Sequence, residues 1–300
     1  MKPEISVIIP VYNDAKGLRV TLNSLLKQDS VFCGYEVIVA DNGSADNTAD
    51  TAKAYIKKYP ERVKLVKEDN VRCPAAARNK GIKASAGDVL CFIDADMWVE
   101  KDCIARINAL FKNPAVVYSG CNVKVVANSG SIVERYSVFK GVPFQVYIEK
   151  LNFAGTGALV VRKEIFNRLG FFDSRLIAGE DTEFGNRVYD AGYKLNYAGD
   201  IFVYHPAYDT LRKIIKKYFR RGQGRYQLFK YYPERYNPSY RDTLNPQLYL
   251  PPNIFKVIKS FTSVTSGKEK IQFGLIKSIC ILSTRYGYLY EKFSSAWKRT

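Results

Sequence analysis

The chain has 300 residues, of which 47% are hydrophobic and 25% are charged. This balance is typical of a globular protein with a substantial buried core, and it excludes a disordered or fibrous protein. The 46 Lys and Arg residues exceed the 29 Asp and Glu residues, so the net charge is +17 and an anionic partner such as nucleic acid or a membrane has to be considered.

Short β-branched segments alternate with helical patterns in the first two thirds of the chain. This alternation predicts βαβ units, and hence an α/β fold with a mainly parallel sheet flanked by helices. The expected strands are 5–9, 36–40, 63–66 and 89–94. The expected helices are 16–27, 47–59, 75–85 and 101–111. Because ligands bind at the carboxyl ends of parallel strands, one crevice is expected to hold Tyr12, Asn13, Asp41, Asn42 and the 94–96 turn.

Basic residues concentrate in the last third of the chain. Residues 206–300 contain 19 Lys and Arg against 5 Asp and Glu, whereas residues 1–205 contain 27 against 24. We therefore predict a nearly neutral domain over 1–205 and a basic, largely helical appendage over 206–300. Turns in the appendage are expected at Pro233, Pro238, Pro246, Pro251 and Pro252.

A basic amphipathic helix is predicted to begin near Leu211. Its apolar stripe is formed by Leu211, Ile214, Ile215, Tyr218 and Phe219. The other face carries Arg212, Lys213, Lys216, Lys217, Arg220 and Arg221. Two environments are open for this helix, since the stripe can pack on the first domain or lie on an anionic bilayer.

The cysteines and the single histidine narrow the chemistry. His205 is the only histidine, which excludes a multi-histidine metal cage. The six cysteines form no CxxC pair and are expected to be reduced packing residues. The N-terminus does not resemble a signal peptide, and no apolar segment reaches the roughly 18 to 20 residues that span a bilayer, so we expect a cytoplasmic protein.

Two carboxylates follow the fourth expected strand. Asp94 and Asp96 flank Ala95 directly after the apolar run VLCFI. Carboxylates at a strand end can hold a divalent cation that neutralises a diphosphate, or they can cap the next helix. The chain has no GxGxxG after its first strand and no GxxxxGK[ST], which argues against a dinucleotide-dependent oxidoreductase and a P-loop NTPase.

Five segments occur in one order along the chain. They are SVIIPVYN, VIVADNGSADNT, ARNKGI, DVLCFIDADMW and AGEDTEFGNRVYDAGYKL. Together they resemble the family 2 glycosyltransferases with the GT-A fold, over about residues 4–205. The resemblance implies an inverting, metal-dependent enzyme of polysaccharide or glycan biosynthesis. Such an enzyme moves one sugar from a nucleoside-diphosphate sugar, with a UDP-sugar favoured, to a hydroxyl of a saccharide or lipid-linked glycan.

The resemblance also implies a donor site. The turn at Pro10 and Tyr12 would hold the nucleotide base, and Asp41 would accept a hydrogen bond from it, unless the carboxylate only closes a turn. Arg78 and Asn79 are expected near the base or phosphate, although Arg78 could instead lie on a solvated helix face. The donor-binding residues expected in full are Pro10, Tyr12, Asp41, Arg78, Asn79, Asp94, Ala95 and Asp96.

A divalent metal, Mn²⁺ or Mg²⁺, is implied by the same resemblance. Asp96 and His205 are its expected ligands, while Asp94 lies nearer the ribose or an outer water molecule. The roles of the two aspartates could be exchanged. His205 could also be an ordinary packing residue.

The reaction needs a base that removes a proton from the acceptor hydroxyl. Family resemblance favours Asp181 for this role, with Glu180 orienting the acceptor or its loop. Both residues open a helical pattern, where acidic side chains also stabilise the first turn. The small residues Gly155, Thr156 and Gly157 are expected along the acceptor site, with an ordinary tight turn as the alternative.

The segment RRGQGRY is expected to be a loop that closes over the diphosphate. Gly222 and Gly224 would act as hinges, and Arg221 or Arg225 would supply charge. Processive synthases carry a QxxRW motif, to which this segment is only distantly similar. The spacing between Gln and Arg differs, and Tyr226 stands in place of Trp. We therefore expect transfer of a single sugar.

The basic appendage suggests peripheral contact with an anionic membrane that carries a lipid-linked acceptor, since each nearby Lys or Arg contributes about 1 kcal/mol. The sequence has no nucleic-acid recognition motif, so no specific nucleic-acid partner is expected. Two other functions stay open. A nucleotidyltransferase that makes sugar nucleotides would need a Gly-rich basic loop after the first strand, and a non-catalytic basic module would have lost the carboxylates.

Overall fold

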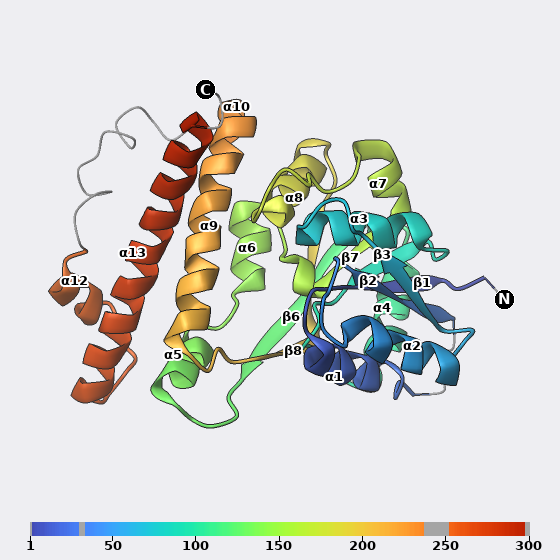
Figure 1. The fold of residues 1–300 in the computed structure, drawn as a ribbon, viewed down its shortest axis with the longest axis horizontal. Helices are drawn as coiled ribbons and strands as arrows, with labels where there is room; N and C mark the ends of the chain where they lie inside the picture. Colours follow the sequence, from blue (N-terminus) through green and yellow to red (C-terminus); the bar gives the residue numbers. More distant parts are fainter. Residues whose placement is uncertain (1, 30–33, 237–251, 298–300) are drawn as a thin grey trace. The chain divides into compact units, whose positions relative to one another are not determined.

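The computed structural model describes residues 2–29, 34–236 and 252–297 (Figure 1). Its contacts divide the chain into two compact units. The first consists of Met1–Val125, Val142–Arg175 and Glu180–Pro206, and the second of Val126–Gly141, Leu176–Gly179 and Ala207–Thr300. The sequence assigned residues 126–141 and 176–179 to the N-terminal domain, whereas the structure groups both segments with the C-terminal third.

The first unit is built on an eight-stranded sheet with the order β3-β2-β1-β4-β7-β6-β8-β5. The strands are β1 (Ile5–Val11), β2 (Tyr35–Asp41), β3 (Val63–Lys67), β4 (Val89–Phe92), β5 (Trp98–Val99), β6 (Tyr118–Val126), β7 (Leu159–Arg162) and β8 (Leu195–Pro206). Strand β1 pairs in parallel with both β2 and β4, and β2 pairs in parallel with β3. The four strands expected from the sequence are therefore confirmed.

The other half of the sheet is antiparallel. Strand β7 runs antiparallel to β4 and to β6, and β5 runs antiparallel to β8. The sheet is thus mixed, and the expectation of a mainly parallel sheet holds only for β1 to β4. A parallel strand that is buried on both faces is a continuous apolar run, which explains why the parallel half was easier to predict.

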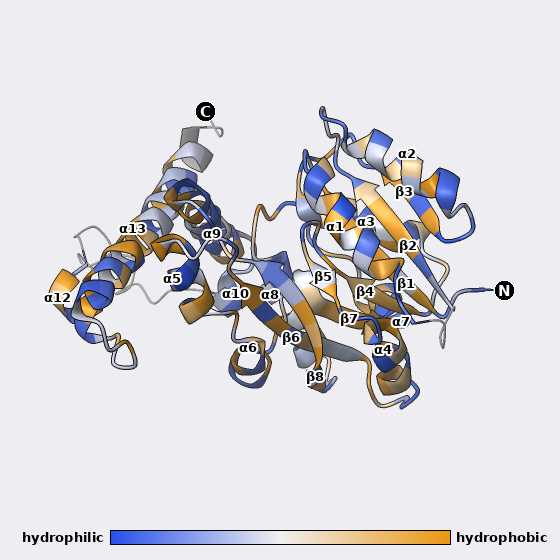
Figure 2. Cartoon of the chain, turned by 90° about the horizontal axis from the view of Figure 1, so that it is seen from below, coloured by the Kyte–Doolittle hydropathy of each residue, from blue (hydrophilic) through white to orange (hydrophobic). Residues whose placement is uncertain are grey.

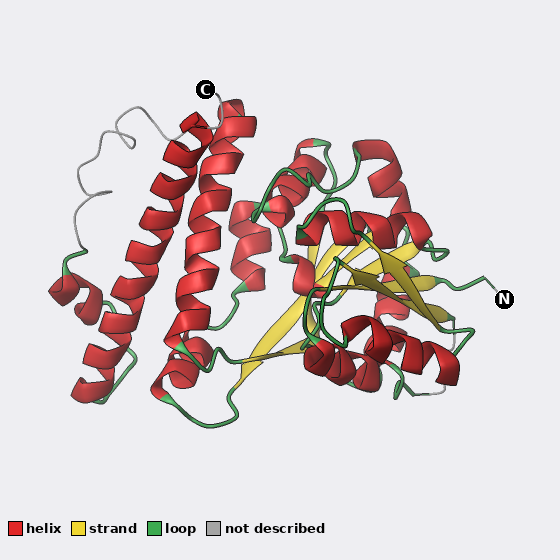
Figure 3. Cartoon of the chain, in the orientation of Figure 1, coloured by secondary structure: helices red, strands yellow, loops and turns green. Residues whose placement is uncertain are grey.

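Helices flank this sheet, as Figure 3 shows. They are α1 (Ala15–Leu25), α2 (Thr48–Lys58), α3 (Pro74–Ala84), α4 (Cys103–Phe111), α6 (Phe144–Leu151), α7 (Lys163–Leu169) and α8 (Glu180–Asp190), with a 3₁₀ turn at Thr156–Ala158. The core between the layers contains fully buried side chains from the strands, such as Ile8, Ile38 and Phe92. Figure 2 shows the central strands as predominantly hydrophobic.

The second unit is helical. Its helices are α5 (Ile132–Lys140), α9 (Leu211–Tyr231), α10 (Pro233–Tyr236), α12 (Ile254–Lys259) and α13 (Gly267–Trp297). It has its own small core, which includes Tyr136, Ile214, Phe273 and Cys280. Ile214 of the predicted apolar stripe therefore packs inside this unit, while Leu211 and Ile215 of the same stripe are exposed.

The RRGQGRY segment is helical, so the expected loop is wrong. It lies inside α9, which runs beside α13 (Figure 1). A Cβ atom on Gly222 would lie 2.0 Å from the carbonyl oxygen of Thr284, and one on Gly287 would lie 2.0 Å from that of Phe219. The glycines thus permit two helices to approach closely, and the packing offsets the roughly 1 kcal/mol that a glycine costs in a helix.

Several smaller expectations can also be compared with the structure. The five cysteines within the described residues are buried and free, as expected, and Cys33 lies outside those residues. Three of the proline turns, at Pro238, Pro246 and Pro251, also lie outside them. In the described part of the chain, no helix combines the length and apolar character needed to cross a membrane.

The helical pattern predicted that Lys217 lies on a solvated basic face, but the structure places it elsewhere. Its ammonium group lies 4.5 Å from the centre of the Tyr208 ring. Burial, followed by repulsion from Arg221 and from Lys140 of α5, lowers the pKa of Lys217 to about 8, although Cys280 acts in the opposite direction. The helix is therefore basic, but burial of the Lys217 charge lowers the stability of the folded protein.

We expect Lys217→Met to stabilise the protein at pH 7 by on the order of 2 kcal/mol. At this pH the lysine is protonated in both the folded and the unfolded chain, so folding bears the cost of burying the charge. Between pH 8 and the ordinary lysine value of 10.5, the folded form is neutral while the unfolded chain keeps its proton. The unaltered protein should therefore gain stability as the pH rises through this range, and the variant should not.

Thermal unfolding of both proteins across this pH range measures the difference. The neighbouring variant Lys216→Met is the control, because Lys216 is exposed and its replacement should leave the pH dependence unchanged. Parallel stability curves for Lys217→Met and the unaltered protein would contradict the assignment.

Candidate functional site

The loops that follow β1 and β2 are joined to each other. The β1–β2 register pairs Val11 with Asp41, so both loops leave the same edge of the sheet. The backbone N–H of Asn13 donates to Ser44 Oγ over 2.9 Å, and the N–H of Ala45 donates to Asn13 Oδ1 over 2.7 Å. Tyr12 lies on this joined pair of loops with 52% of its surface exposed, so its ring is available to a planar ligand.

Asp41 lies at the end of β2 and is only 2% exposed. Its Oδ1 accepts a hydrogen bond from the N–H of Ser44 over 3.2 Å. The turn interpretation left open by the sequence therefore holds for one carboxylate oxygen. Pro10, one residue before the end of β1, is buried beside Ala40 in the same ladder.

Arg78 of α3 is the centre of a buried charge cluster. Its guanidinium donates from Nη1 to Glu180 Oε1 and from Nη2 to Asp94 Oδ1, each over 2.7 Å. Burial alone would lower the pKa of Arg78, but attraction to Asp94 and Glu180 outweighs it and raises the pKa. The alternative that Arg78 lies on a solvated helix face is therefore wrong, because its side chain is only 5% exposed. The guanidinium joins Asp94, just after β4, to Glu180, the first residue of α8.

The small-residue turn lies against two of the predicted carboxylates. A Cβ atom on Gly157 would lie 3.0 Å from Asp94 Oδ2, and one on Gly155 would lie 3.6 Å from Asp181 Oδ2. Thr156 between them is buried. The turn thus brings Asp94 and Asp181 to one place, with backbone instead of side chains beside each carboxylate.

Tyr118 supports the residue just before this turn, a role that was not predicted. Its hydroxyl group accepts a hydrogen bond from the N–H of Ala154 over 2.8 Å and donates to the carbonyl of the same residue over 3.4 Å. Burial is the main reason that the pKa of Tyr118 is raised, and Asp181 adds to the effect. A tyrosine within an apolar strand gives no sequence signal for such a role.

Asp181 lies in the first turn of α8. Its Oδ1 accepts a hydrogen bond from the N–H of Thr182 over 2.7 Å, and Gly179 before the helix has a φ of +91°. The left-handed conformation at Gly179 favours glycine, and it turns the chain into α8. Oδ1 therefore serves the helix start, while Oδ2 is the oxygen beside Gly155.

Residues of α9 hold the backbone just before α8. Gln227 Oε1 accepts from the N–H of Ile177 over 2.8 Å, and Arg220 Nη2 donates to the carbonyl of Ile177 over 3.0 Å. Gln227 also donates to Glu291 of α13 over 2.8 Å. These contacts lie within the second unit, and they fix the segment that leads along the chain into Glu180. Neither Gln227 nor Glu291 was predicted, because no motif in the sequence contains them.

Asp96 and His205 lie at the same end of the β5–β8 ladder. Trp98 pairs with Tyr204, and their rings stack with centres 5.6 Å apart. Asp96 lies two residues before Trp98 of β5, and His205 is the residue after Tyr204 of β8. Because the two strands are antiparallel, both residues lie at the same end of the ladder. Asp96 has a φ of +86°, an uncommon conformation for a residue with a side chain and one that often marks a functional turn.

The tautomer of His205 suits a metal ligand. Its Nδ1 lies 2.5 Å from the carbonyl oxygen of Pro206. A carbonyl can only accept a hydrogen bond, so Nδ1 carries the proton and Nε2 keeps a lone pair in the neutral ring. A backbone carbonyl bound to one ring nitrogen commonly orients a histidine whose other nitrogen holds a metal.

The described residues offer few protein ligands to a divalent ion. Within the described residues, no group of three or more His, Cys, Asp or Glu side chains is positioned to hold a metal. Mg²⁺ is usually bound by one or two carboxylates, with phosphate and water oxygens completing its coordination. Asp94, Asp96 and His205 therefore do not form a three-ligand site. One or two of them could hold an ion only together with oxygens of a bound diphosphate, and this metal site stays a prediction.

Asn79 and Ala95 differ from the other predicted donor residues. The amide of Asn79 donates to the carbonyl of Phe172 over 2.8 Å and accepts from its N–H over 3.1 Å. Ala95 is partly buried against the core. Asn79 thus joins α3 to the segment after α7, and its contact with a donor stays a prediction.

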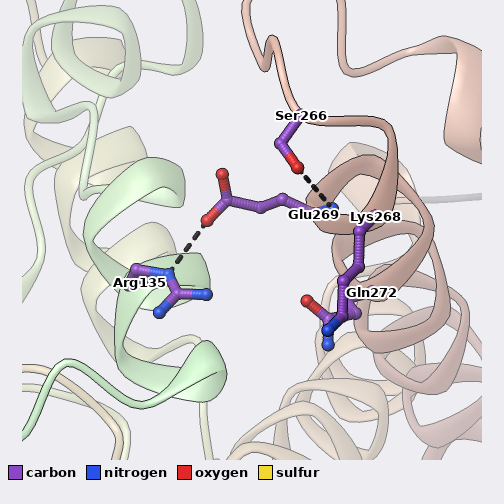
Figure 4. Close-up of a pocket in the computed structure, with 5 residues that line it drawn as sticks. All are labelled: Arg135, Ser266, Lys268, Glu269 and Gln272. Carbon is purple, nitrogen blue, oxygen red and sulfur yellow. Dashed lines mark hydrogen bonds and ion pairs between the residues drawn. The ribbon is translucent and has the colours of Figure 1, made fainter.

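A pocket of about 480 Å³ lies in the second unit and contains none of the predicted site residues (Figure 4). Its walls are formed by Arg135, Ser266, Lys268, Glu269 and Gln272. Glu269 accepts from Arg135 Nε over 2.9 Å, which links α5 to the start of α13. A partly exposed ion pair therefore lines this pocket.

Two family descriptions match the sequence. Glycosyl transferase family 2 matches residues 6–170, and Glycosyl transferase family group 2 matches residues 89–284. Among curated proteins, Glycosyltransferase AglE of Haloferax volcanii is 36% identical over 228 residues, which cover 76% of this chain and 74% of that protein. Pre-mycofactocin glycosyltransferase of Mycobacterium tuberculosis is 27% identical over 74% of this chain, and the match spans about half of that longer protein.

Solved structures share the fold. The mannosyltransferase PcManGT from Pyrobaculum calidifontis, in complex with GDP-Man and Mn²⁺, is 19% identical with a TM-score of 0.65, covering 100% of this chain and 89% of that chain. TarS of S. aureus in complex with UDP-GlcNAc is 18% identical with a TM-score of 0.56, covering 96% and 92%. At such low identity these likenesses show the fold alone.

Proposed function

Because the chain belongs to glycosyl transferase family 2 and has the GT-A fold, we propose that this glycosyltransferase moves one sugar from a nucleoside-diphosphate sugar to a hydroxyl of a saccharide or lipid-linked glycan. The transfer is an inverting, single displacement in glycan or polysaccharide biosynthesis. The observation that carries the proposal is the cluster in which Arg78 joins Asp94 to Glu180 while the turn at Gly155 and Gly157 contacts Asp94 and Asp181.

The donor base lies between the loops after β1 and β2. Tyr12 offers an exposed ring, and Pro10 shapes the turn. Asp41 keeps Oδ2 for the imide N–H of uracil while Oδ1 closes the turn, which favours a UDP-sugar. The complexes of PcManGT with GDP-Man and of TarS with UDP-GlcNAc support a nucleoside-diphosphate sugar as the donor class.

Asp96 and His205 would hold a divalent metal, Mn²⁺ or Mg²⁺, with Asp94 near the ribose or an outer water. When bound, such an ion would supply positive charge against the departing diphosphate. The Mn²⁺ in the PcManGT complex supports this expectation. Arg78 keeps Asp94 oriented, since its guanidinium holds one carboxylate oxygen in a fixed direction.

Asp181 removes the acceptor proton, using the carboxylate oxygen that lies beside Gly155. Its other oxygen is bound at the start of α8, so the base has a fixed orientation. Glu180 orients the acceptor side through its ion pair with Arg78. We place the acceptor along the turn at Gly155, Thr156 and Gly157, where the absence of side chains on the glycines leaves room for Phe144 beside Gly155 and for Asp94 beside Gly157.

The charge of the C-terminal region bears on the acceptor and on the cellular setting. Residues 1–205 form the catalytic domain, and the basic region at 206–300 brings the enzyme to an anionic membrane on its cytoplasmic face. A lipid-linked acceptor would account for this basic region. A specific nucleic-acid partner is not part of the proposal, because charge alone gives only nonspecific binding.

Calorimetric titration with UDP, GDP and CDP, each with and without Mn²⁺, tests the proposal. We expect one diphosphate to bind only when the metal is present, and Asp96→Ala to weaken that binding by about 100-fold or more. Asp102→Ala is the matched control, since Asp102 is half exposed and pairs with Arg106 away from the cluster. Metal-independent binding, or equal affinity for Asp96→Ala and the unaltered protein, would overturn the metal assignment.

A further inference from the structure

Helix α13 carries an exposed apolar stripe along most of its length. The stripe consists of Ile271, Leu275, Leu282, Tyr286, Tyr290 and Phe293. Their spacings of three, four and seven residues place them on one face of the helix. The exposed fraction ranges from 43% at Leu282 to 66% at Tyr286. At 1.5 Å per residue, the stripe is roughly 33 Å long.

Only the edge of this stripe contributes to packing inside the second unit. The rings of Tyr286 and Tyr290 lie 5.8 and 5.5 Å from the ring of Phe219 in α9, yet both residues stay more than half exposed. The buried residues Phe273, Ile276 and Cys280 belong to the core of the second unit, and Gly287 contacts α9. Helix α13 is therefore apolar on a second, outward face, where a surface helix is ordinarily polar. Contiguous exposed apolar surface of this kind usually marks an interaction site.

The charges of α13 favour an anionic partner. Its two described acidic side chains are engaged elsewhere, because Glu269 pairs with Arg135 (Figure 4) and Glu291 accepts from Gln223 and Gln227. Helical positions place four cations along one flank of the stripe: Lys270, Lys277, Arg285 and Lys292. The surrounding residues 206–300 hold 19 basic and 5 acidic side chains.

A neighbouring helix adds to the same surface chemistry. Ile258 of α12 packs against Gly274 of α13. On α12, Phe255 is 75% exposed and is followed directly by Lys256. Exposed aromatic rings beside lysines are typical of segments that lie in the interface of a membrane, where the ring enters the headgroup boundary and the ammonium meets lipid phosphate.

We propose that the α13 stripe docks on the surface of an anionic lipid bilayer, with the helix lying in the plane of the interface. The proposal rests on the membrane contact proposed above and assigns that contact to α13 instead of the basic face of α9. The apolar side chains supply burial in the acyl boundary, and the flanking cations supply attraction to lipid phosphate. The stripe has no acidic side chain that would oppose this attraction.

Co-sedimentation with vesicles tests the proposal. The full chain should bind vesicles of phosphatidylcholine and phosphatidylglycerol, and it should bind pure phosphatidylcholine much less. The triple variant Ile271→Ser, Leu282→Ser, Phe293→Ser should lose about 100-fold in partitioning, because three partly inserted apolar side chains are removed. It leaves the Tyr286 and Tyr290 rings against Phe219 in place. The matched control replaces exposed apolar residues of the first unit, Tyr189→Ser with Phe171→Ser, and should bind as the unaltered protein does.

Two further readouts separate the outcomes. Vesicle binding that survives in the triple variant overturns the proposal. A dimer in light scattering that the triple variant converts to a monomer, without vesicle binding, also overturns it and assigns the stripe to a second copy of the chain. Titration with nucleoside diphosphates on the same samples tests the proposed transferase site independently, since its failure would leave the vesicle result standing.

Discussion

Replacing Asp181 by Asn should leave donor binding unchanged and reduce turnover by about 100- to 10,000-fold, the usual contribution of a general base. The amide keeps the size of the carboxylate and can still accept from the N–H of Thr182, so the start of α8 is preserved. It cannot take a proton from the acceptor hydroxyl. The measurement is the release of nucleoside diphosphate in the presence of a saccharide acceptor that the unaltered enzyme uses.

Asp190→Asn is the matched control, because Asp190 lies at the other end of α8 and its replacement removes the same charge. It should retain full turnover. If Asp181→Asn releases nucleoside diphosphate at nearly the normal rate, Asp181 is not the base, and Glu180 becomes the next residue to test.

The sequence predicted the half of the site that lies close to strand ends. Asp41 is the last residue of β2, and Asp94 comes two residues after β4. Both strands are buried and parallel, and such strands are recognisable as continuous apolar runs. The family segments added Glu180 and Asp181, which the structure places beside Arg78 and Gly155. Local pattern was sufficient here because each residue is fixed by the element in which it lies.

Contacts between distant segments could not be predicted in the same way. Arg78 and Glu180 are 102 positions apart, so no helical or strand period links them. A glycine such as Gly222 indicates a loop as readily as a close helix contact, and only the approach of Thr284 distinguishes them. Lys217 belongs to a basic helical face by its spacing, yet its ammonium group lies over the Tyr208 ring and the residue is only partly exposed.

Arg78→Met should destabilise the protein by about 3 to 5 kcal/mol, because it leaves a buried carboxylate without its partner. The side chain of Glu180 is only 9% exposed, so water cannot replace the guanidinium there. The side chain of Asp94 is 41% exposed and can be solvated, so it should contribute less. Thermal or denaturant unfolding measures the loss, and Arg106→Met is the control. The exposed Arg106–Asp102 pair should be worth less than about 1 kcal/mol.

A second substitution shows whether the stranded charge is the cause. Adding Glu180→Gln to Arg78→Met removes the uncompensated carboxylate while keeping its volume, and it should recover more than half of the lost stability. Adding Asp94→Asn instead should recover less, since that carboxylate is already partly solvated. If neither addition restores stability, the loss comes from the packing of the arginine stem, and the buried ion pair is not what joins α3 to the start of α8. Recovery with Glu180→Gln but not with Asp94→Asn would establish that the interaction between Arg78 and Glu180 holds the start of α8, and therefore the proposed base, in place.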